Sequence, residues 1–378
     1  MENPGLYIHI PFCRRKCAYC AFYSVASFDA GKTASYLQAL LAEARWFASH
    51  RFHDAKPKIR TVYIGGGTPS ILPVSFYSAL FEGLESCFDF SGCIEWSFEA
   101  NPEHLGQAYL SELWKNTPIR RLSIGLQSFR DEDLHVLKRW HTGREAVEAI
   151  GMARNAGFKN LSVDLMYGLW QEEGLRHWKE NLMKLAELDV PHFSAYALTL
   201  EPGTLLWKRV KQGMARMAPD EEIEEEFKEL QAFAKRNGYE HYEISNLARP
   251  GFEAVHNSNY WREIPYIGLG ASAHSFIGNE RSWNVARLEE YVRDPASSKE
   301  RESLSEEDRY HEYVMTALRT SRGVEKSRLA AFQESFREEF LERAAAEMKK
   351  GNMAETEDSY VVRENRRLLT DAIAETFF

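Results

Sequence analysis

Apolar and polar residues alternate in six short stretches of the N-terminal half of the chain, and we expect a β-strand at each. Between these stretches, apolar residues recur at helical spacing. A strand that is regularly followed by a helix predicts βα units and a parallel sheet. The expected strands cover residues 6–10, 61–65, 94–99, 122–127, 161–166 and 192–197.

The two faces of these strands differ in polarity. One face carries apolar side chains, such as Leu6 and Ile8, and the other carries small or polar ones. A doubly wound sheet buries both faces and tends to show continuous apolar runs. We therefore predict an α/β fold built on a partial (β/α)6 barrel of the TIM type. Glu99, Gln127 and Asp164 end three of the strands, at the edge where barrel enzymes keep their chemistry.

The pattern loosens in the C-terminal half. Pro219 opens an acidic helix that Asn237 and Gly238 end, and we expect its acidic run, 221–226, to be solvated. Charged residues fill 294–308, which we interpret as a linker. A hairpin-like segment, 353–363, lies between helices in a small, mainly helical module that resembles a winged helix.

These features divide the chain into three parts. We expect residues 1–240 to form the barrel, 241–300 to close it, and 301–378 to form the small C-terminal domain. The middle part is unusually dense in Asn, His, Gly and aromatic residues between 244 and 278.

Charge and hydropathy narrow the class of protein. The net charge is −9 over 378 residues, so no basic footprint predicts nucleic-acid binding. No apolar run approaches the roughly 20 residues that cross a bilayer, and the first residues do not look like a signal peptide. We predict a soluble cytoplasmic protein.

Three of the five cysteines, Cys13, Cys17 and Cys20, follow the first expected strand. Disulfides are rare in the cytoplasm, so a metal centre is favoured over a disulfide. Structural zinc normally needs four ligands, usually two separated Cys-x-x-Cys pairs, and no second pair follows. His9 alternates onto the polar face, so we interpret it as a residue of the barrel interior and not as a fourth ligand. We interpret Cys87 and Cys93 as packing residues.

The spacing Cys-x-x-x-Cys-x-x-Cys, on a loop after the first strand of a βα barrel, resembles the radical S-adenosylmethionine (SAM) superfamily. The resemblance implies a [4Fe–4S] cluster held by Cys13, Cys17 and Cys20, with one iron left open for the amino and carboxylate groups of SAM. In such enzymes, reductive cleavage of SAM gives methionine and a 5′-deoxyadenosyl radical, while the protein positions the reactants.

The same resemblance implies a set of SAM-binding residues at the strand ends. A glycine loop at 65–69 is expected to meet the methionyl amino group, and Arg139 to pair with the SAM carboxylate. Taken singly, each of these residues is also explained as an interior polar residue satisfied by its neighbours. The full set is Tyr7, Phe22, Gly66, Gly67, Thr68, Glu99, Gln127, Arg139 and Asp164.

Within the superfamily, the residues around Cys13, the glycine loop and the stretch 125–129 resemble the oxygen-independent coproporphyrinogen III oxidase-like family. The dehydrogenase of that family carries a fourth cysteine where this chain has Phe22. The chain also carries a His-Asn-x-x-Tyr-Trp motif, which is shared with the HemW-type heme chaperones. Its residues are His256, Asn257, Tyr260 and Trp261.

The motif is compatible with two roles. An imidazole can ligate heme iron while aromatic rings stack on the macrocycle. Alternatively, the segment is a packed turn in which His256 bonds the backbone and Trp261 fills the core. His274 is a rival heme ligand or a residue of the barrel rim.

The resemblance implies a chaperone that binds heme and transfers it to acceptor hemoproteins, such as respiratory enzymes. The alternative is a coproporphyrinogen III dehydrogenase or another radical SAM enzyme that modifies tetrapyrroles. Radical chemistry would need an electron donor such as a flavodoxin or ferredoxin. Delivery of heme would bring the protein to the membrane surface, and a homodimer is compatible with the family pattern.

Overall fold

Six parallel strands form the centre of the sheet, as the alternation predicts. The computed structural model describes residues 2–26, 28–52, 55–169, 173–296 and 299–378. Each observed strand matches its predicted range to within one residue at either end. The strands are β1 (Gly5–Ile10), β2 (Thr61–Gly66), β3 (Glu95–Ala100), β4 (Arg121–Gln127), β5 (Asn160–Tyr167) and β6 (His192–Ala197).

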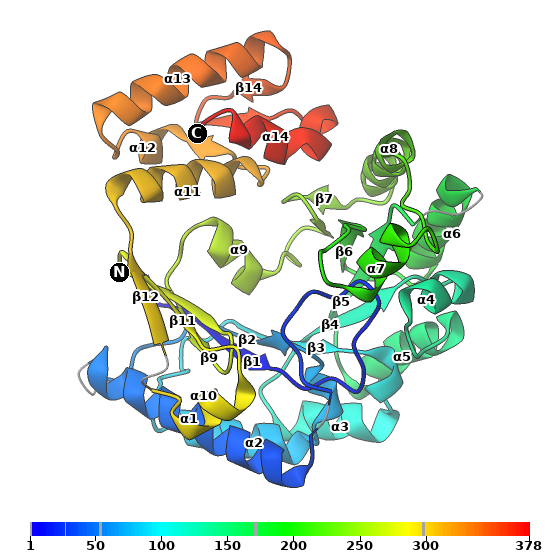
Figure 1. Cartoon of the computed structure of the whole chain (residues 1–378), viewed down its shortest axis with the longest axis vertical. Coiled ribbons are helices and arrows are strands. Elements are labelled where there is room, and N and C mark those ends of the chain that lie inside the picture. Colours follow the sequence, from blue (N-terminus) through cyan, green and yellow to red (C-terminus); the bar gives the residue numbers. More distant parts are fainter. Residues whose placement is uncertain (1, 27, 53–54, 170–172, 297–298) are drawn as a thin grey trace.

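Helices cover the apolar outer face of this sheet (Figure 1). The alternate strand residues that face them, such as Leu6, Ile8, Ile64 and Leu122, are fully buried in one core. The small and polar side chains at the other alternate strand positions therefore face the concave interior, as expected. The covering helices are α1 (Ala30–His50), α2 (Val74–Leu84), α3 (Gln107–Asn116), α5 (Gly143–Ala156), α6 (Gly174–Glu187) and α8 (Asp220–Arg236). Two short helices, α4 (Asp131–Leu137) and α7 (Leu205–Lys211), follow β4 and β6 and pack beside the cysteine loop.

The middle part of the chain extends the sheet at both ends. Strands β9 (Tyr266–Leu269), β10 (His274–Ile277), β11 (Glu280–Asn284) and β12 (Lys299–Ser303) continue outward from β1. Strands β8 (Asn246–Ala248) and β7 (Glu240–His241) continue outward from β6. Within the described residues, β12 and β7 are the two unpaired edges, so the partial barrel is confirmed and it is open.

The interpretation of 294–308 as a linker is wrong, because this stretch contains β12 and the first turn of α11 (Glu306–Leu318). Lys299 on β12 forms a buried ion pair with Glu43 of α1, with 2.5 Å between Nζ and Oε1. Glu43 also accepts hydrogen bonds from the Tyr291 hydroxyl, at 2.6 Å, and from the Asn284 amide, at 2.8 Å. The charged residues of this stretch therefore belong to an edge strand that a buried ion pair anchors to α1.

The acidic run on α8 is solvated with one exception. Glu226 is buried and its carboxylate accepts a hydrogen bond of 2.6 Å from the backbone N–H of Gly168. Burial, followed by the charges of Glu222 and Asp133, raises the pKa of Glu226 to about 7.

A second hydrophobic core holds the C-terminal part together, with Phe340, Val324 and Phe377 at its centre. Three antiparallel strands lie among four helices, in the order helix, strand, two helices, two strands and a final helix, which matches the winged-helix pattern and the predicted hairpin. After α11 come β13 (Val324–Glu325), α12 (Lys326–Leu329), α13 (Glu334–Lys349), β14 (Met353–Glu355), β15 (Ser359–Val362) and α14 (Thr370–Glu375).

The short helix α9 (Val255–Trp261) lies between the barrel and this unit, because it contacts β2 and β3 on one side and α11 on the other (Figure 1). A further short helix, α10 (Leu288–Arg293), packs against α1. None of the described helices is long and apolar enough to span a bilayer.

Candidate functional site

The loop that carries the three clustered cysteines leaves β1 at its C-terminal end. Backbone hydrogen bonds from Cys13 to Val25, at 3.0 Å, and from Val25 to Pro11, at 2.7 Å, close the loop at its base. Ala18, between the second and third cysteines, is bonded through its backbone to Leu137 and Leu206. The loop is therefore held against the segments that follow β4 and β6.

All three thiols on this loop are free and half-buried. Burial raises the pKa of Cys13, and the other two thiols raise it further, which shows that the three sulfurs interact electrostatically. The Thr68 hydroxyl lies 3.3 Å from the Cys13 sulfur, and the Arg139 guanidinium donates to the Cys17 sulfur at 3.5 Å. These thiols fit a [4Fe–4S] group with three protein ligands, since thiolates are the ligands of such clusters and Arg139 compensates their charge. In the described part of the chain, no three His, Cys, Asp or Glu side chains are arranged to hold a single metal ion.

The glycine loop packs directly against the base of the cysteine loop. Gly66 has φ +116°, and a Cβ there would lie 2.5 Å from the His9 ring. A Cβ at Gly67 would lie 2.7 Å from the carbonyl oxygen of Phe12. Only glycine allows this approach, which brings Thr68 to the first cysteine.

Glu99 at the end of β3 is fixed by two donors. The Tyr63 hydroxyl donates to its carboxylate at 2.7 Å and the backbone N–H of Gly66 donates at 3.0 Å. Burial raises the pKa of Glu99. On β1, the Tyr7 hydroxyl lies 3.0 Å from Nδ1 of His9, whose Nε2 is buried without a partner among the described residues.

A bulge at the end of β4 positions Gln127 and the carbonyl group of Gly125. The register of β4 against β5 shifts between Gly125 and Gln127, and Gln127 adopts a left-handed φ of +73°. The carbonyl group of Gly125 and the side chain of Asn101 both accept hydrogen bonds from Arg139, at 2.5 and 2.9 Å. Arg139 therefore joins the ends of β3 and β4 to the cysteine loop through Cys17.

Asp164 on β5 lies beside these residues in the sheet. Its register partners are Gly125 on β4 and Ser194 on β6, and the Ser123 hydroxyl donates to its carboxylate at 3.4 Å. Burial raises the pKa of Asp164. A half-buried carboxylate that faces other polar groups in a concave interior is suited to hold ligand hydroxyl groups.

Phe22 lies at the far end of the cysteine loop with its side chain 72% exposed. Its backbone N–H hydrogen-bonds to the Cys20 thiol, which opposes the larger effect of burial in raising the Cys20 pKa. The backbone of Phe22 thus supports the cysteine loop, and its predicted contact with SAM stays a prediction.

The structure brings the predicted strand-end residues to one concave edge. Two further members of this cluster, Tyr63 and Asn101, are absent from the predicted set. Asn101 follows β3 directly, so its place at a strand end could have identified it as a site residue. Tyr63 alternates onto the polar face and carried the same signal.

The His-Asn-x-x-Tyr-Trp motif forms helix α9, whose first backbone N–H groups are capped by Glu95 at 2.7 and 3.0 Å. The His256 ring is buried. Its Nδ1 lies 2.9 Å from the Thr61 hydroxyl, its Nε2 lies 2.9 Å from the Tyr260 hydroxyl, and the ring stacks on Tyr63. Burial, together with the Arg121 charge, lowers the pKa of His256 to about 3. Both nitrogens of a neutral imidazole are therefore engaged inside the protein.

The other motif residues are less buried. Asn257 is half-buried, and Trp261 lies under the Arg319 guanidinium, 5.6 Å from the ring centre. His274 is exposed at the start of β10 and stacks on Trp283. The structure does not bring these residues to the cysteine loop.

Comparisons with known proteins agree with this arrangement. The family described as the radical SAM superfamily matches residues 7–174. Heme chaperone HemW of Bacillus subtilis (strain 168) is 33% identical over 331 residues, covering 86% of this chain and 85% of the relative. Heme chaperone HemW of Haemophilus influenzae is 30% identical and covers 99% of this chain and 97% of the relative.

A solved structure shares the fold across the whole chain. Coproporphyrinogen III oxidase (HemN) from Escherichia coli, described as a radical SAM enzyme, superposes with a TM-score of 0.83. The alignment covers 100% of this chain and 90% of that structure, at 24% sequence identity. This likeness concerns the fold alone.

Proposed function

Since this chain belongs to the HemW family of the radical SAM superfamily, we propose that it binds heme and transfers it to acceptor hemoproteins. The observation that carries the proposal is the similarity to proteins named heme chaperones over nearly the full length of both chains. In this proposal, Cys13, Cys17 and Cys20 hold a [4Fe–4S] cluster, and SAM binds beside it as an exchangeable ligand.

The geometry of the concave edge supports the cluster and SAM sites. Thr68 and Arg139 contact two of the three sulfurs, so hydrogen bonds and positive charge stabilise the thiolate forms that a cluster needs. When bound, a cluster and SAM supply one-electron reductive chemistry.

The protein residues act by binding and orientation. Glu99 and Asp164 offer half-buried carboxylates to ribose hydroxyl or amino groups, and Arg139 offers a guanidinium to a carboxylate. Tyr7, Gln127 and the glycine loop, Gly66 to Thr68, complete the enclosure. Thr68 and Gln127 are buried and the other groups of this set are half-buried, so together they limit the access of water to the site.

The hydrogen bonds of His256 restrict its role as an iron ligand. In the present conformation, His256 ligates iron only if it releases either Thr61 at Nδ1 or Tyr260 at Nε2, because iron takes one ring nitrogen. Asn257, Tyr260 and Trp261 accordingly serve heme handling through a rearrangement of α9, or they serve only to join the barrel to the C-terminal unit.

The remaining partners follow from the same proposal. Acceptor hemoproteins receive the heme in the cytoplasm or at the membrane surface, and a flavodoxin or ferredoxin supplies electrons where SAM is cleaved. Residues 1–240 carry the cluster, 241–300 carry the heme motif, and 301–378 form the C-terminal domain. We also propose that the chain forms a homodimer, which the mass of the reconstituted protein in solution tests.

The test is anaerobic reconstitution with iron and sulfide, followed by titration with hemin and by a coproporphyrinogen III assay. We expect about four irons per chain, stable hemin binding, and no catalytic release of carbon dioxide. Cys17→Ala should lose the cluster, whereas Cys93→Ala, a cysteine outside the loop, should retain it. Vinyl product formed at catalytic turnover would contradict the chaperone function and support the dehydrogenase.

A further inference from the structure

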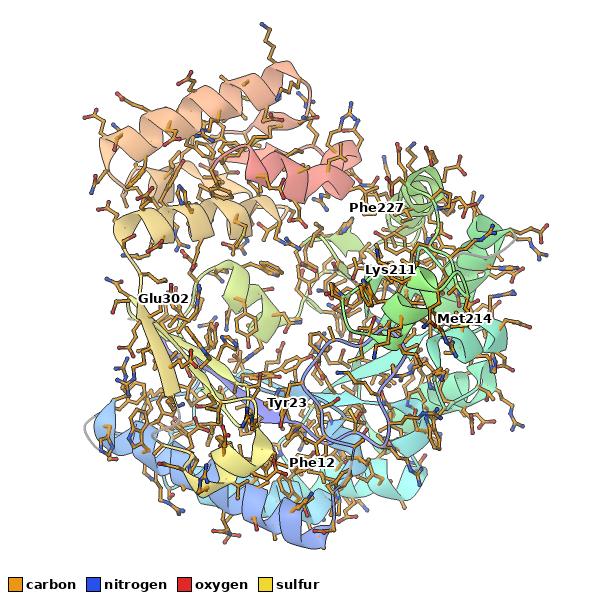
Figure 2. All side chains as sticks on the ribbon, in the orientation of Figure 1. Phe12, Tyr23, Lys211, Met214, Phe227 and Glu302 are labelled. Atoms are coloured by element: carbon orange, nitrogen blue, oxygen red, sulfur yellow. The ribbon has the colours of Figure 1, made fainter. Side chains whose placement is uncertain are left out.

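A large cavity opens beside the cysteine loop, on the side away from α9. Its volume is about 1010 Å³, at the upper end of the range for cofactor sites. Five segments line it: the cysteine loop, the end of α4 with the residues that follow, Leu169 after β5, Leu198 after β6, and α7 with residues 213–216. Figure 2 labels Lys211 and Met214 on the last of these segments.

The cavity is strongly cationic in a chain of net charge −9. Arg15, Lys138 and Arg209 line it together with Arg139 and Arg216, and no acidic residue is among the described residues of the lining. Within the described part of the chain, no ion pair joins Arg15, Lys138 or Arg209 to an acidic residue. The cavity is therefore suited to an anionic ligand.

The rest of the lining is apolar and partly flat. Leu198 and Leu206 are buried at its floor. Trp140 is 54% exposed and Met214 is 67% exposed, so both present apolar surface to an occupant. Arg14 lies over the Trp140 ring, 5.5 Å from its centre, and holds the indole in place.

We propose that this cavity is the heme site of the chain, an inference that rests on the proposed function. Heme combines an apolar plane with two propionates, and the cavity combines apolar side chains with five cationic ones. His135, on the last turn of α4, lines the cavity and supplies the axial imidazole, while Lys138 and Arg209 bind the propionates. His135 is exposed and has no side-chain hydrogen bond to another described residue, in contrast to buried His256.

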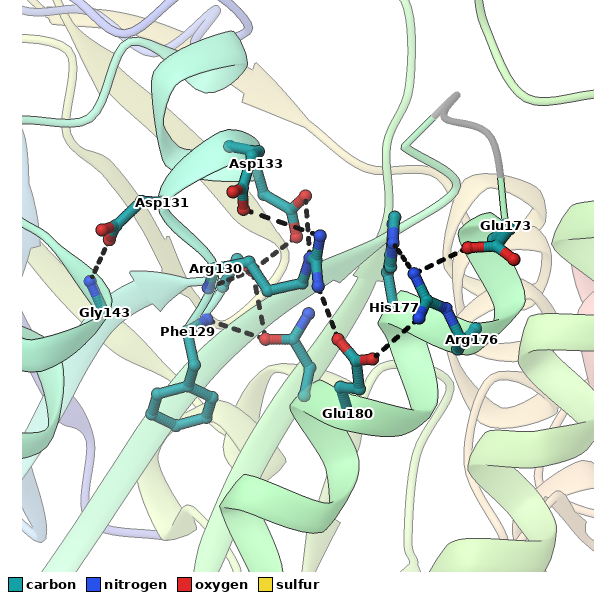
Figure 3. A network of polar contacts seen from close by, with 12 residues as sticks. Phe129, Arg130, Asp131, Asp133, Gly143, Glu173, Arg176, His177 and Glu180 are labelled. Atoms are coloured by element: carbon teal, nitrogen blue, oxygen red, sulfur yellow. Dashed lines mark hydrogen bonds and ion pairs between the residues drawn. The ribbon is translucent and has the colours of Figure 1, made fainter.

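The helix that carries His135 is firmly held. Figure 3 shows Arg130, just before α4, joined to Glu180 of α6 at 2.5 Å. Within α4, Asp133 accepts from Ser128 at 2.6 Å and Asp131 accepts from the backbone of Gly143 at 2.8 Å. Supporting contacts of this kind hold a binding residue in one geometry.

Lys138 ends the helix in a left-handed conformation with φ +56°, and its N–H bonds the carbonyl groups of the last turn. This conformation is costly for a residue other than glycine. It turns the chain sharply, so that His135 and Lys138 line one cavity with Arg139.

The experiment compares hemin affinity and absorption spectra of the full, reconstituted chain and its variants. The test variants are Arg209→Gln combined with Lys138→Gln, and separately His135→Gln. The matched controls are Lys208→Gln, an exposed cation on α7 outside the cavity, and His50→Gln, an exposed histidine on α1. Hemin dimethyl ester, which lacks free propionates, serves as a second probe.

We expect the double variant to bind hemin about 100-fold more weakly, since each charge-assisted hydrogen bond contributes about tenfold. The ester should bind the double variant and the unsubstituted chain alike. His135→Gln should shift the heme absorption maximum, and the controls should leave affinity and spectrum unchanged.

Two results would overturn the proposal in distinguishable ways. If the unsubstituted chain binds hemin and the variants bind it equally well, the cavity is not the heme site, although the proposed function stands. If the unsubstituted chain binds no hemin, the proposed function itself fails. Variants that bind hemin normally but accept electrons more slowly from an acidic redox protein would assign the cavity to that partner instead.

Discussion

His256 shows how strongly a single residue's surroundings limit its chemistry. A histidine in a motif shared with heme chaperones suggests an iron ligand, but its neighbours Thr61 and Tyr260 occupy both ring nitrogens. The residue types alone do not reveal this, because Thr61 is distant in sequence. Helix α9 inserts the ring between Thr61 of β2 and Tyr260, four residues further along the helix.

Replacing His256 with alanine should destabilise the folded chain by about 3 kcal/mol, because two buried hydroxyl groups lose their partner. Urea unfolding of the full chain measures this loss. His274→Ala, at an exposed position, should change stability by less than about 0.5 kcal/mol. Equal effects of the two substitutions would contradict the structural role of His256.

Glu226 is a second residue whose surroundings change its behaviour. Its pKa is raised to about 7 in the folded chain, compared with roughly 4.3 in an unfolded chain. The folded state therefore binds the proton more tightly, and the stability contributed by the protonated group is lost as pH rises through about 7. Asp133 and Glu222 add to this loss because they repel the ionised form.

Glu226→Gln keeps an acceptor for the Gly168 N–H and removes the charge. We expect it to stabilise the chain by about 1 kcal/mol at pH 8 relative to pH 5.5, after discounting for partial solvent screening. Thermal unfolding at the two pH values measures this difference. Glu225→Gln, its exposed neighbour on α8, should show no such dependence.

At the level of elements, period-two alternation predicted all six central strands and the polarity of their faces. It also placed Glu99, Gln127 and Asp164 at one edge, because parallel strands end together. The bulge at Gln127 was not predictable, since its left-handed φ arises from the packing of β4 against β5. Strand β12 was missed because an anchored edge strand and a linker are both rich in charge.

Lys299→Met should therefore destabilise the chain by about 3 kcal/mol, since it leaves the Glu43 carboxylate buried without its cation. Adding Glu43→Gln to this variant should restore part of the loss, because the uncompensated charge is then removed. Glu302→Gln, an exposed position on the same strand, is the control. Chemical unfolding measures all four proteins, and a near-zero effect of Lys299→Met would mean that β12 is not anchored by this pair.

At the scale of the whole molecule, the described residues form two large cores and a small third one beside the cysteine loop. The barrel core and the C-terminal core share no buried residue. Polar contacts cross between the two parts, such as those of Arg328 with Glu263 and of Gln231 with the backbone of Glu364. Polar contacts of this kind allow the two parts to unfold separately.

Phe340→Ala removes a fully buried ring from the C-terminal core and should cost about 4 kcal/mol there. We expect a separate, lower thermal transition of the C-terminal part, and the barrel should retain its cluster absorbance and hemin binding above that transition. Leu341→Ala, at a neighbouring exposed position, should leave the unfolding curve unchanged. A single shared transition in the Phe340 variant would show that the two cores unfold together.

The open edge of the sheet has one further consequence. An unpaired strand offers backbone groups to any other extended chain, which makes it a template for aggregation. Strand β12 carries Lys299, Glu300, Arg301 and Glu302 in succession, and the opposite edge, β7, has only two residues. An incoming strand would have to bury these charges, so the molecule can keep its barrel open to ligands and remain dispersed at high concentration.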